Sequence, residues 1–580
     1  MTFGPALPST VANGPRLTGK LPKGLGLAYA GGTMPTHQVL NQPPPLEGYN
    51  LFAADRALAE GLRRERAAWA EERVRTLGEL AGGEALRWGV QANANPPVLR
   101  THDRYGHRVD EVEFHPAWHE LLRLAVGHEL HALPWRDPRP GAHVARAALF
   151  FVLGQVEAGH GCPISMTYSA IPALRAQPEL AAEWEPRFTS TAYDPRLVPA
   201  ARKTGALCGM AMTEKQGGSD VRANTTRAVA LRARGPGAEY ELTGHKWFCS
   251  APMCDAFLVL AQAEQGLSCF LLPRFLPDGT RNRFHIQRLK DKLGNRSNAS
   301  SEVEFDRAWA RMVGEEGRGV PTIIEMVNHT RLDCVIGSAA AVRQAVAQAT
   351  HHCAHRAAFG KLLTDQPLMQ NVLADLAVES EAATVAMLRL ARAYDEGPRD
   401  ETQRRFARLA TAVVKYWVCK RGPMLVAEAL ECLGGNGYVE ESMMPRLYRE
   451  APLNSIWEGS GNVICLDVLR AMAREPESVE ALFGEIGQAG GDERRLDLFV
   501  ENLRQDLGRS EAIEARARRL VERMAVALQA SLLVRYGDPA VAEAFCVSRL
   551  DGDRGLAFGT LPAGLDFGRI IERARPHASR

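Results

Sequence analysis

The amino-acid sequence predicts a mostly α-helical protein with one small β-domain, in the order helices, strands, helices and further helices. Apolar residues recur at helical spacing from about residue 50 to 200 and again from residue 319 onward. Between residues 205 and 310 the pattern changes to short β-branched or aromatic runs separated by Gly, Pro and Asn, which is typical of strands and turns. With 580 residues, 46% of them hydrophobic, the chain is long enough to bury a large core in several domains.

Five segments are predicted from these changes of pattern. The first segment is rich in Gly, Pro and Thr and lacks apolar periodicity, so we expect a flexible arm. In the fourth, helical patterns cover residues 321–358, 367–394, 402–433 and 459–474, which predicts a four-helix bundle. The predicted segments are the flexible N-terminal arm (1–35), an N-terminal α-helical domain (36–204), a β-domain (205–312), the four-helix bundle (313–474) and a C-terminal helical domain (484–580).

Charge and cysteine content exclude several classes of protein. The 70 basic and 68 acidic side chains leave a formal net charge of +2, so no global signal points to nucleic acid or to an anionic membrane. The 11 cysteines form no CxxC pair, which argues against a disulfide framework or a zinc site. No apolar run approaches the roughly 20 residues that span a bilayer, and the N-terminus lacks the layout of a secretory signal. We therefore expect a cytoplasmic protein that holds no metal.

The densest candidate site is the segment MTEKQGGSDVRANTT, residues 212–226. Gly217 and Gly218 allow the backbone to approach a ligand, while Thr213, Ser219 and exposed amide groups can hydrogen-bond to it. The segment is no Walker or Rossmann fingerprint, because neither GxxxxGK[ST] nor a strand–GxGxxG–helix unit is present. It is either a cofactor loop at the entrance to the β-domain or a polar Gly-rich turn.

Two other stretches offer ligand contacts. In GHKWFCS, Trp247 offers an aromatic face and Ser250 a hydroxyl to a flat heterocycle such as a flavin, although a tryptophan there can equally belong to the core. In RAAFGK, Arg356 and Phe359 lie three residues apart before Gly360 at a predicted helix end. That arrangement suits either a phosphate clamp or ordinary helix capping.

Two Gly-rich turns follow near the end of the predicted bundle. ECLGGNGYVEE contains Gly434 and Gly435, so the chain turns sharply there and can expose backbone N–H groups. In NSIWEGSGNVICLDVLR, Glu458 lies between Trp457 and Gly459 at a predicted helix start. Desolvation there raises the pKa of a carboxyl group and the helix dipole lowers it, which makes Glu458 a candidate base in a narrow apolar cleft. Helix capping is the alternative.

The order and spacing of these motifs resemble the acyl-CoA dehydrogenase superfamily: the TE-x-x-GGSD loop, the KW strand, RxxFGK, LGGNGY and WEGSG. Four further stretches are similar to its AidB-type alkylation-response branch: NQPPPLEGYNL (41–51), DEVEFHPAWH (110–119), LKDKLGNRSNASSEVEF (289–305) and PRLYREAPLNSIWEGSGN (445–462). The resemblance implies an acyl-CoA dehydrogenase-like fold, non-covalent FAD and a homotetramer made of two dimers.

It also implies the cofactor contacts. The isoalloxazine is expected against the β-domain, the flavin phosphates near the turn after Glu458, and the adenine end in a site completed by the neighbouring subunit. The residues implied for the isoalloxazine are Met212, Thr213, Gly218, Ser219, Trp247 and Ser250; those for the phosphates are Ser460 and Asn462; those for the adenine end are Arg356, Phe359, Gly434 and Gly435.

For the reaction, the resemblance implies that a carboxylate removes the α-proton of an acyl-CoA thioester, and Glu458 matches that base. Isovaleryl-type members carry their base on another helix, where this chain has Thr330, which cannot act as one, followed by Arg331. Arg470 resembles an arginine that enters the acyl pocket in the AidB-type branch, where a cation makes a plain fatty-acyl chain a poor guest. An exposed helix arginine is the other interpretation. Thr330, Arg331 and Arg470 are the predicted substrate-pocket residues.

The resemblance further implies that the C-terminal domain binds double-stranded DNA. Between residues 484 and 580 the 15 arginines are matched by 15 acidic side chains, so net charge does not support that role. Arg516, Arg519 and Arg523 fall on one helical face with Arg518 beside them, and such a face can follow phosphates. Interleaved glutamates make a solvated, salt-bridged helix the alternative.

Three functions remain open at this point. The first is an FAD-containing protein of the adaptive response to DNA alkylation that binds and protects double-stranded DNA. Such a protein would inactivate alkylating small molecules and have weak isovaleryl-type acyl-CoA dehydrogenase activity. The second is a catabolic acyl-CoA dehydrogenase that passes electrons to an electron-transferring flavoprotein. The third keeps FAD only as a structural group.

Overall fold

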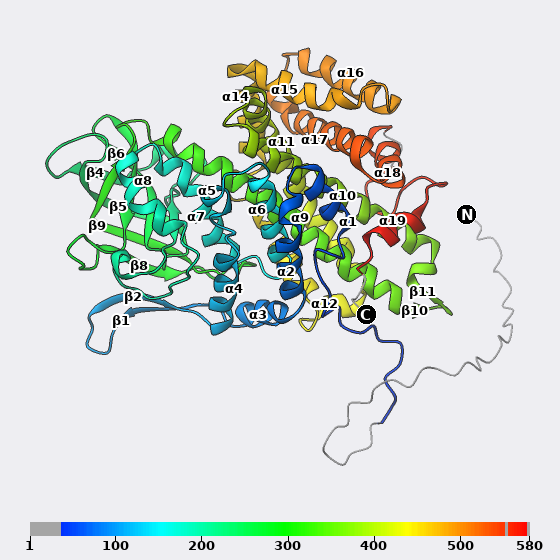
Figure 1. Cartoon of the computed structure of the whole chain (residues 1–580), viewed down its shortest axis with the longest axis horizontal. Helices are drawn as coiled ribbons and strands as arrows, with labels where there is room; N and C mark the ends of the chain where they lie inside the picture. The colour runs from blue at the N-terminus through cyan, green and yellow to red at the C-terminus, as the bar shows by residue number, and fades with distance from the viewer. Residues whose placement is uncertain (1–35, 552–554, 577–580) are drawn as a thin grey trace, which may run out of the picture. The chain divides into compact units, whose positions relative to one another are not determined.

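The structure is a computed structural model that describes residues 36–551 and 555–576, so the predicted arm at 1–35 lies outside the described residues. Residues 36–42 belong to a separate unit and contain no helix or strand. The described part of Pro43–Arg580 is one compact unit, with the β-domain at one end, on the left in Figure 1, and the long helices beside it.

The N-terminal part is built around two buried helices, α6 (Ala142–Gly154) and α7 (Gly161–Leu174), whose side chains are almost all buried because they are apolar or small around the whole helix. Other helices cover them. These are α1 (Arg56–Arg64), α2 (Glu71–Gly82), α3 (Glu84–Ala94), α4 (Pro116–Gly127), α5 (Leu133–Arg136) and α8 (Pro178–Phe188).

One element in this region was not predicted. An antiparallel hairpin of β1 (Val98–His102) and β2 (Arg108–Glu113) interrupts the segment that the sequence assigned to helices, and it lies beside strand β8 of the β-domain. Asp103 accepts hydrogen bonds from the backbone of Tyr105 and His107, and Gly106 has a φ of 84°, so the chain turns tightly there.

The β-domain is a closed arrangement of strands. The pairing order is β3-β6-β4-β5-β9-β7, and β7 also pairs with β6, so the sheet closes on itself, with β8 added beside β9. The strands β6 and β7 bury nearly every side chain. The strands are β3 (Cys208–Ala211), β4 (Arg227–Ala230), β5 (Glu239–Ser250), β6 (Ala256–Ala263), β7 (Gly266–Pro273), β8 (Phe284–Leu289) and β9 (Ser300–Val313).

Long helices form the bundle after the β-domain. They are α9 (Gly319–His355), α10 (Pro367–Glu396), α11 (Glu401–Glu431) and α14 (Gly461–Arg474), close to the four helical patterns predicted from the sequence. Shorter elements fill the connections: β10 (Ala357–Ala358) and β11 (Lys361–Leu362) form a small hairpin, and α12 (Gly435–Tyr438) and α13 (Met444–Glu450) precede the turn to α14.

The last helices pack on the bundle through α15, α17, α18 and α19 (Figure 1). Arg549 of α18 is buried and donates to Asp375 and Glu379 of α10, and Arg573 of α19 donates to Glu381 of the same helix. The helices are α15 (Pro476–Ile486), α16 (Arg494–Gly508), α17 (Ile513–Tyr536), α18 (Pro539–Leu550) and α19 (Phe567–Ala574).

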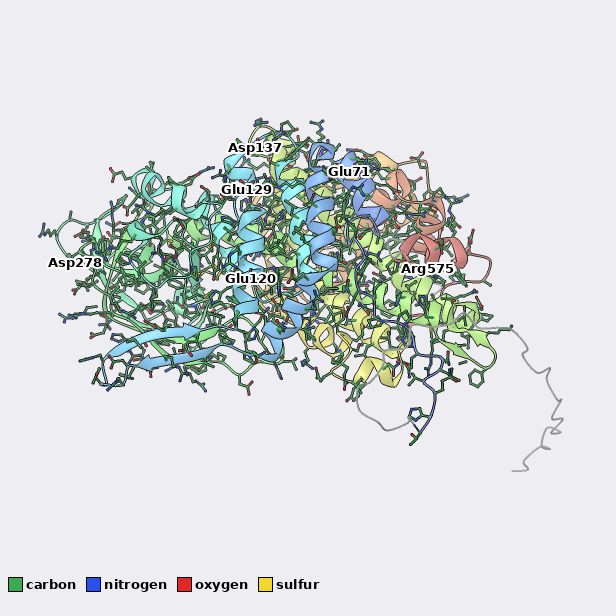
Figure 2. All side chains as sticks on the ribbon, turned by 60° about the horizontal axis from the view of Figure 1, so that its bottom comes forward. Glu71, Glu120, Glu129, Asp137, Asp278 and Arg575 are labelled. Atoms are coloured by element: carbon green, nitrogen blue, oxygen red, sulfur yellow. The ribbon has the colours of Figure 1, made fainter. Side chains whose placement is uncertain are left out.

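Ion pairs join these parts at two depths. On the N-terminal helices, Glu129, which Figure 2 labels, accepts from Arg73 and Arg136 in partly exposed pairs. Inside, Arg146 of α6 forms a two-pronged pair with Asp333 of α9, with 2.8 Å between Nη2 and Oδ2, and both side chains are at most 3% exposed. Such a buried pair fixes one helix against the other, because either charge left alone would be costly.

We therefore expect Asp333→Ala to destabilise the protein by about 3–5 kcal/mol, since Arg146 would keep its buried charge without a partner. Denaturant unfolding of the purified protein measures this change. Glu401→Ala removes the carboxylate of an exposed pair on α11 and should leave the unfolding midpoint unchanged. Equal effects of the two substitutions would contradict a special role for the buried pair.

Candidate functional site

The predicted base, Glu458, lies in a tight turn just before α14. Its backbone is left-handed, with a φ of 58°, and Gly459 follows with a φ of 107°. Thr330 Oγ1, on α9, donates to Glu458 Oε2 at 2.7 Å. The structure thus places a threonine against the carboxylate at the position where isovaleryl-type relatives are expected to carry their own base.

Arg331, the next residue of α9, contacts the backbone of the same turn. Its Nε donates to Glu458 O at 3.1 Å, and its Nη1 donates to Asp467 Oδ2 of α14 at 2.7 Å. Asp467 also accepts from Arg408 of α11 at 3.2 Å. These contacts tie three bundle helices together beside the predicted base.

A second cation at this turn, Lys415, was not predicted. Its Nζ donates to Trp457 O at 2.9 Å and to Gly459 O at 2.6 Å, the carbonyls on either side of Glu458. Lys415 lies in the middle of a mostly buried stretch of α11, where no local sequence pattern distinguishes it from a core position. Only the fold brings it to the turn.

These neighbours oppose each other in their effect on Glu458. Desolvation raises the pKa of its carboxyl group above the usual value, while the Thr330 hydrogen bond and the charges of Arg331 and Lys415 lower it. The residue as a whole is half-buried, but protein atoms enclose the carboxyl group, and desolvation dominates. A carboxylate of this kind can accept a proton at neutral pH.

The predicted flavin loop is held from beneath by a buried carboxylate. Glu214, fully buried, accepts hydrogen bonds from the backbone and hydroxyl groups of Thr225 and Thr226 and from Lys246 Nζ at 2.8 Å. Lys246 points inward from β5, and burial lowers its pKa to about 8 while Glu214 raises it. Neither residue was predicted to have a role, although both lie within the quoted motifs.

This anchoring leaves the tip of the loop exposed. Gly218 and Ser219 are exposed, and a Cβ atom on Gly218 would lie 2.3 Å from Thr213 Oγ1. Only glycine therefore allows this close approach. The Trp247 amide donates to Thr213 O at 2.8 Å, and Lys290 Nζ lies 3.2 Å from the centre of a Trp247 ring. The loop and the end of β5 are thus one unit with an exposed tip at Gly218 and Ser219 and a partly exposed aromatic ring.

Cys162, at the start of α7, connects this unit with the base. Burial raises the pKa of its thiol to about 11, the charge of Lys292 and a hydrogen bond with Ser250 lower it, and the charge of Glu458 raises it. Asn298, 1% exposed, lies beside the same thiol, and a hydrogen bond from its side chain also lowers the pKa of that thiol.

The residues predicted for the adenine end lie apart from this centre. Arg356 is half-buried, Phe359 is 100% exposed with a φ of 52°, and Gly434 and Gly435 are exposed. The two segments are neighbours, because Cys353 Sγ lies 3.8 Å from the carbonyl oxygen of Cys432. A fully exposed phenylalanine is a side chain suited to contact with another molecule.

The turn before α14 meets the C-terminal helices. Ser460, exposed, precedes the first residue of α14, and Asn462 Oδ1 accepts from Arg518 Nε of α17 at 2.8 Å. Arg518 therefore contacts a residue predicted to bind cofactor. Arg470, predicted to enter the substrate pocket, is exposed on α14, and no hydrogen bond or ion pair shown for the described residues joins it to Glu458. The arginine that reaches Glu458 is Arg331.

Two of the four arginines predicted to contact DNA bind the end of α16 in the structure. Arg516 donates to the carbonyl oxygens of Asp506 and Arg509 at the end of α16, and Arg523 pairs with the Asp506 side chain. These are interactions that a helix C-terminus favours. Arg519 is exposed, and within the described chain no hydrogen bond or ion pair is shown for it.

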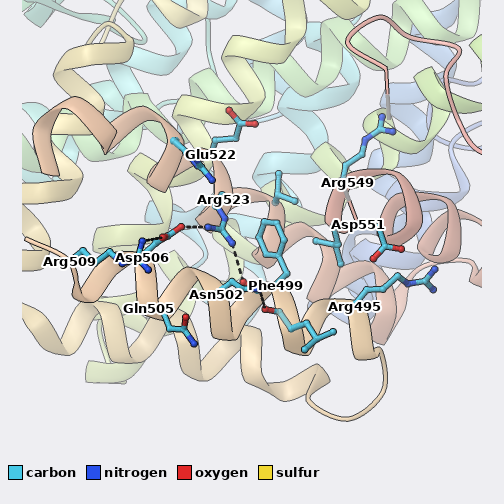
Figure 3. A pocket seen from close by; sticks show the side chains of 14 residues that line it. Arg495, Phe499, Asn502, Gln505, Asp506, Arg509, Glu522, Arg523, Arg549 and Asp551 are labelled. Carbon is cyan, nitrogen blue, oxygen red and sulfur yellow. Dashed lines mark hydrogen bonds and ion pairs between the residues drawn. The ribbon is translucent and has the colours of Figure 1, made fainter. Parts of the chain in front are cut away.

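A groove of about 600 Å³ opens between α16, α17 and α18 (Figure 3). Arginines outnumber acidic side chains along it, and Figure 3 shows Arg509 and Arg523 on either side of Asp506. The arginines are Arg495, Arg509, Arg519, Arg523 and Arg549, and the acidic residues are Asp506, Glu522 and Asp551.

Among the described residues, no helix combines the length and apolar composition that crossing a membrane requires. The same residues contain no group of three or more His, Cys, Asp or Glu side chains placed to hold a metal ion.

Comparison with known families gives matches along most of the chain. Residues 41–195 match the adaptive response protein AidB N-terminal domain, residues 209–308 the acyl-CoA dehydrogenase middle domain, and residues 317–473 the acyl-CoA dehydrogenase C-terminal domain. The putative acyl-CoA dehydrogenase AidB of Escherichia coli K12 is 46% identical over 519 residues, which cover 89% of this chain and 95% of that protein. Acyl-CoA dehydrogenase family member 11 of Caenorhabditis elegans is 29% identical, covering 80% of this chain and 74% of that protein.

Two solved structures have a similar fold over most of the chain. Caenorhabditis elegans ACDH-11, in complex with C11-CoA, superposes with a TM-score of 0.81 at 26% identity, covering 89% of this chain and 93% of that one. The apo form of Bd2924 superposes with a TM-score of 0.78 at 28% identity, covering 86% of this chain and 99% of that one.

The anchoring of the predicted flavin loop leads to a prediction about cofactor binding. Glu214→Gln puts an amide donor among the donors of Lys246, Thr225 and Thr226, so the loop should loosen and FAD should bind roughly 10-fold more weakly or worse. Flavin fluorescence released on dilution measures this. Asp220→Asn makes the same chemical change on an exposed residue of the loop and should leave FAD bound. Equal flavin retention in both variants would contradict the anchoring role.

Proposed function

Because the chain belongs to the acyl-CoA dehydrogenase family, in its AidB-type branch, we propose that it oxidises an acyl-CoA thioester with Glu458 as the base. Members of this family depend on FAD, and FAD is the cofactor of this chain. The exposed Gly218 and Ser219 at the tip of the 213–219 loop and the partly exposed Trp247 ring are groups that fit the flavin ring. When bound, FAD accepts the hydride that leaves the acyl group.

The observation that supports this proposal best is the environment of Glu458. Its carboxylate is desolvated, hydrogen-bonded by Thr330 and held on a turn whose backbone is fixed on α9 and α11. In the proposed reaction Glu458 takes the α-proton of the thioester, and the loss of that proton accompanies transfer of the β-hydride. Thr330 orients the carboxylate and has no basic group of its own.

We further propose that the acyl group is short and branched, of the isovaleryl type, and that turnover is slow. Isovaleryl-CoA dehydrogenases are among the relatives at 26–29% identity. Thr330, Arg331 and Asp467 make the surroundings of Glu458 polar, which disfavours a long hydrocarbon chain. The catabolic alternative, with electrons passed to an electron-transferring flavoprotein, predicts fast turnover instead.

A second proposed role is in the adaptive response to DNA alkylation, in which the protein binds double-stranded DNA, protects it and inactivates alkylating agents. It is supported by the 46% identity to the AidB protein and by the arginine-lined groove of Figure 3. Of the predicted arginines, Arg519 has the position best suited to a phosphate, and Arg509 at the groove is 70% exposed.

The assembly is proposed to be a cytoplasmic homotetramer, a dimer of dimers. Large apolar side chains lie exposed near the predicted adenine site: Phe359 is 100% exposed, Leu368 84% and Tyr438 81%. A second copy of the chain would bury them and would complete the FAD site through Arg356, Gly434 and Gly435. Light scattering of the flavin-loaded protein determines the number of chains.

For the dehydrogenase role, we expect Glu458→Gln to slow anaerobic bleaching of the flavin by isovaleryl-CoA roughly 100- to 10,000-fold, because the amide cannot accept the proton. FAD content and DNA affinity should stay at the wild-type level. The uncharged control Ser455→Ala changes a half-buried residue of the preceding turn and should bleach normally. Unaltered bleaching in Glu458→Gln would rule out this base.

For the DNA role, we expect Arg509→Ala with Arg519→Ala to weaken binding of duplex DNA. The slope of log affinity against log salt should fall by about 1 for each phosphate that the protein no longer neutralises. Gel-shift titrations at several salt concentrations measure both quantities. The control Arg404→Ala with Arg405→Ala removes two partly exposed arginines of α11 and should leave both unchanged. If both double variants have the same slope, Arg509 and Arg519 do not contact DNA phosphates.

A further inference from the structure

Lys415 occupies an unusual place for a lysine. It lies in the middle of α11 and is 1% exposed, and within the described residues no carboxylate forms an ion pair with it. Its ammonium group donates to two carbonyl oxygens, Trp457 O at 2.9 Å and Gly459 O at 2.6 Å. A buried ammonium group is costly unless it serves an interaction that an apolar residue could not provide.

The turn it holds needs such support. Glu458 has a φ of 58°, a left-handed conformation that side chains rarely adopt, and Gly459 follows with a φ of 107°. Arg331 Nε holds the carbonyl between the two that Lys415 holds, at 3.1 Å. Three successive carbonyl oxygens therefore face cations from α9 and α11, and the Glu458 side chain projects from the centre of that stretch.

Charge adds to geometry. The pKa of Glu458 is raised by desolvation, and the charges of Arg331 and Lys415 lower it. The other titratable groups that face Glu458 are the thiols of Cys162 on α7 and Cys334 on α9, which burial keeps neutral. Arg331 already pairs with Asp467 at 2.7 Å, so part of its charge is neutralised. Lys415 has no such partner among the described residues.

We propose that Lys415 is a positioning residue for the base: it holds the carbonyls on both sides of Glu458, so that the carboxylate keeps one orientation and its ionised form. This inference rests on the proposed dehydrogenase function and deepens it. Lys415 acts through Glu458 and need not touch the substrate.

The test compares Lys415→Met, which keeps the length of the side chain without its charge, with Lys415→Arg and with the control Arg405→Met near the start of α11. Anaerobic flavin bleaching by isovaleryl-CoA is followed from pH 5 to 9, per bound flavin. In Lys415→Met we expect a kcat roughly 10- to 100-fold lower, since small misplacements of a base have effects of that size. The acid limb of the pH–rate profile should move to higher pH by about 1 unit, because the pKa of Glu458 rises when one of the two cations that oppose desolvation is removed.

The acid limb moves to higher pH because of the role of the base. Glu458 acts when it is deprotonated, so activity falls as pH drops through its pKa, and a higher pKa moves that fall to higher pH. Lys415→Arg keeps the charge, so its acid limb should stay at the wild-type position while kcat drops less. KM, FAD content and the Arg405→Met profile should remain at wild-type values. If Lys415→Met loses only thermal stability and keeps its acid limb and kcat, Lys415 has a structural role and does not position the base.

A second measurement separates this inference from the proposed function. If no acyl-CoA bleaches the wild-type flavin, the dehydrogenase function fails, and Lys415 is judged by denaturant unfolding of the flavin-loaded protein. Lys415→Met, Glu458→Gln and the double variant form a cycle. Each single change already removes the attraction between the two charges, so the double variant should unfold at a higher denaturant concentration than the summed single losses predict. Additive losses would overturn the coupling between Lys415 and Glu458.

Discussion

Charged side chains inside the helix bundle must find partners, and the structure satisfies this constraint with residues from distant segments. Asp333 of α9 pairs with Arg146 of the N-terminal helices, and Asp375 and Glu379 of α10 pair with Arg549 of α18. Because a lone buried charge is far more costly than a paired one, each pair fixes the position of one part against the bundle. The N-terminal and C-terminal helices are thus held to the same central helices.

The candidate site uses the same device at the point of chemistry. Arg331 and Lys415 come from two bundle helices and place their charges on the backbone of the Glu458 turn. These contacts support the left-handed backbone conformation of Glu458, which lies outside any helix. A base on this turn depends on the packing of α9 against α11, and any change that separates those helices should also change the acidity of Glu458.

In the β-domain, a buried ion pair supports the predicted flavin loop in a similar way. The Glu214–Lys246 pair is buried beneath the 213–219 loop and leaves only the tip of that loop exposed. Many donors converge on one carboxylate, which makes the loop rigid before any ligand binds. Preorganisation of this kind favours tight binding of a flat, polar ring, because little ordering is needed on association.

The sequence by itself determined the fold class, the four helical patterns of the bundle and the motifs that contain the candidate site residues. Helical and strand periodicities depend on neighbouring residues, so they can be read along the chain. Glu458 can be recognised in the same way, because it lies next to glycines in a short motif. The matches to the acyl-CoA dehydrogenase domains and the superposition on ACDH-11 confirm that fold class. The β1–β2 hairpin was missed because its short strands alternate weakly within a helical region.

Tertiary structure alone decided which side chains serve the motifs. Lys415 is 43 positions from Glu458 and looks like any core position of α11, and only packing brings its ammonium to the turn. The same holds for Arg470, which the fold leaves exposed, and for Arg516, which caps α16. The physical reason is that hydrogen bonds and ion pairs between distant segments depend on how the helices pack, which periodicity along the chain does not encode.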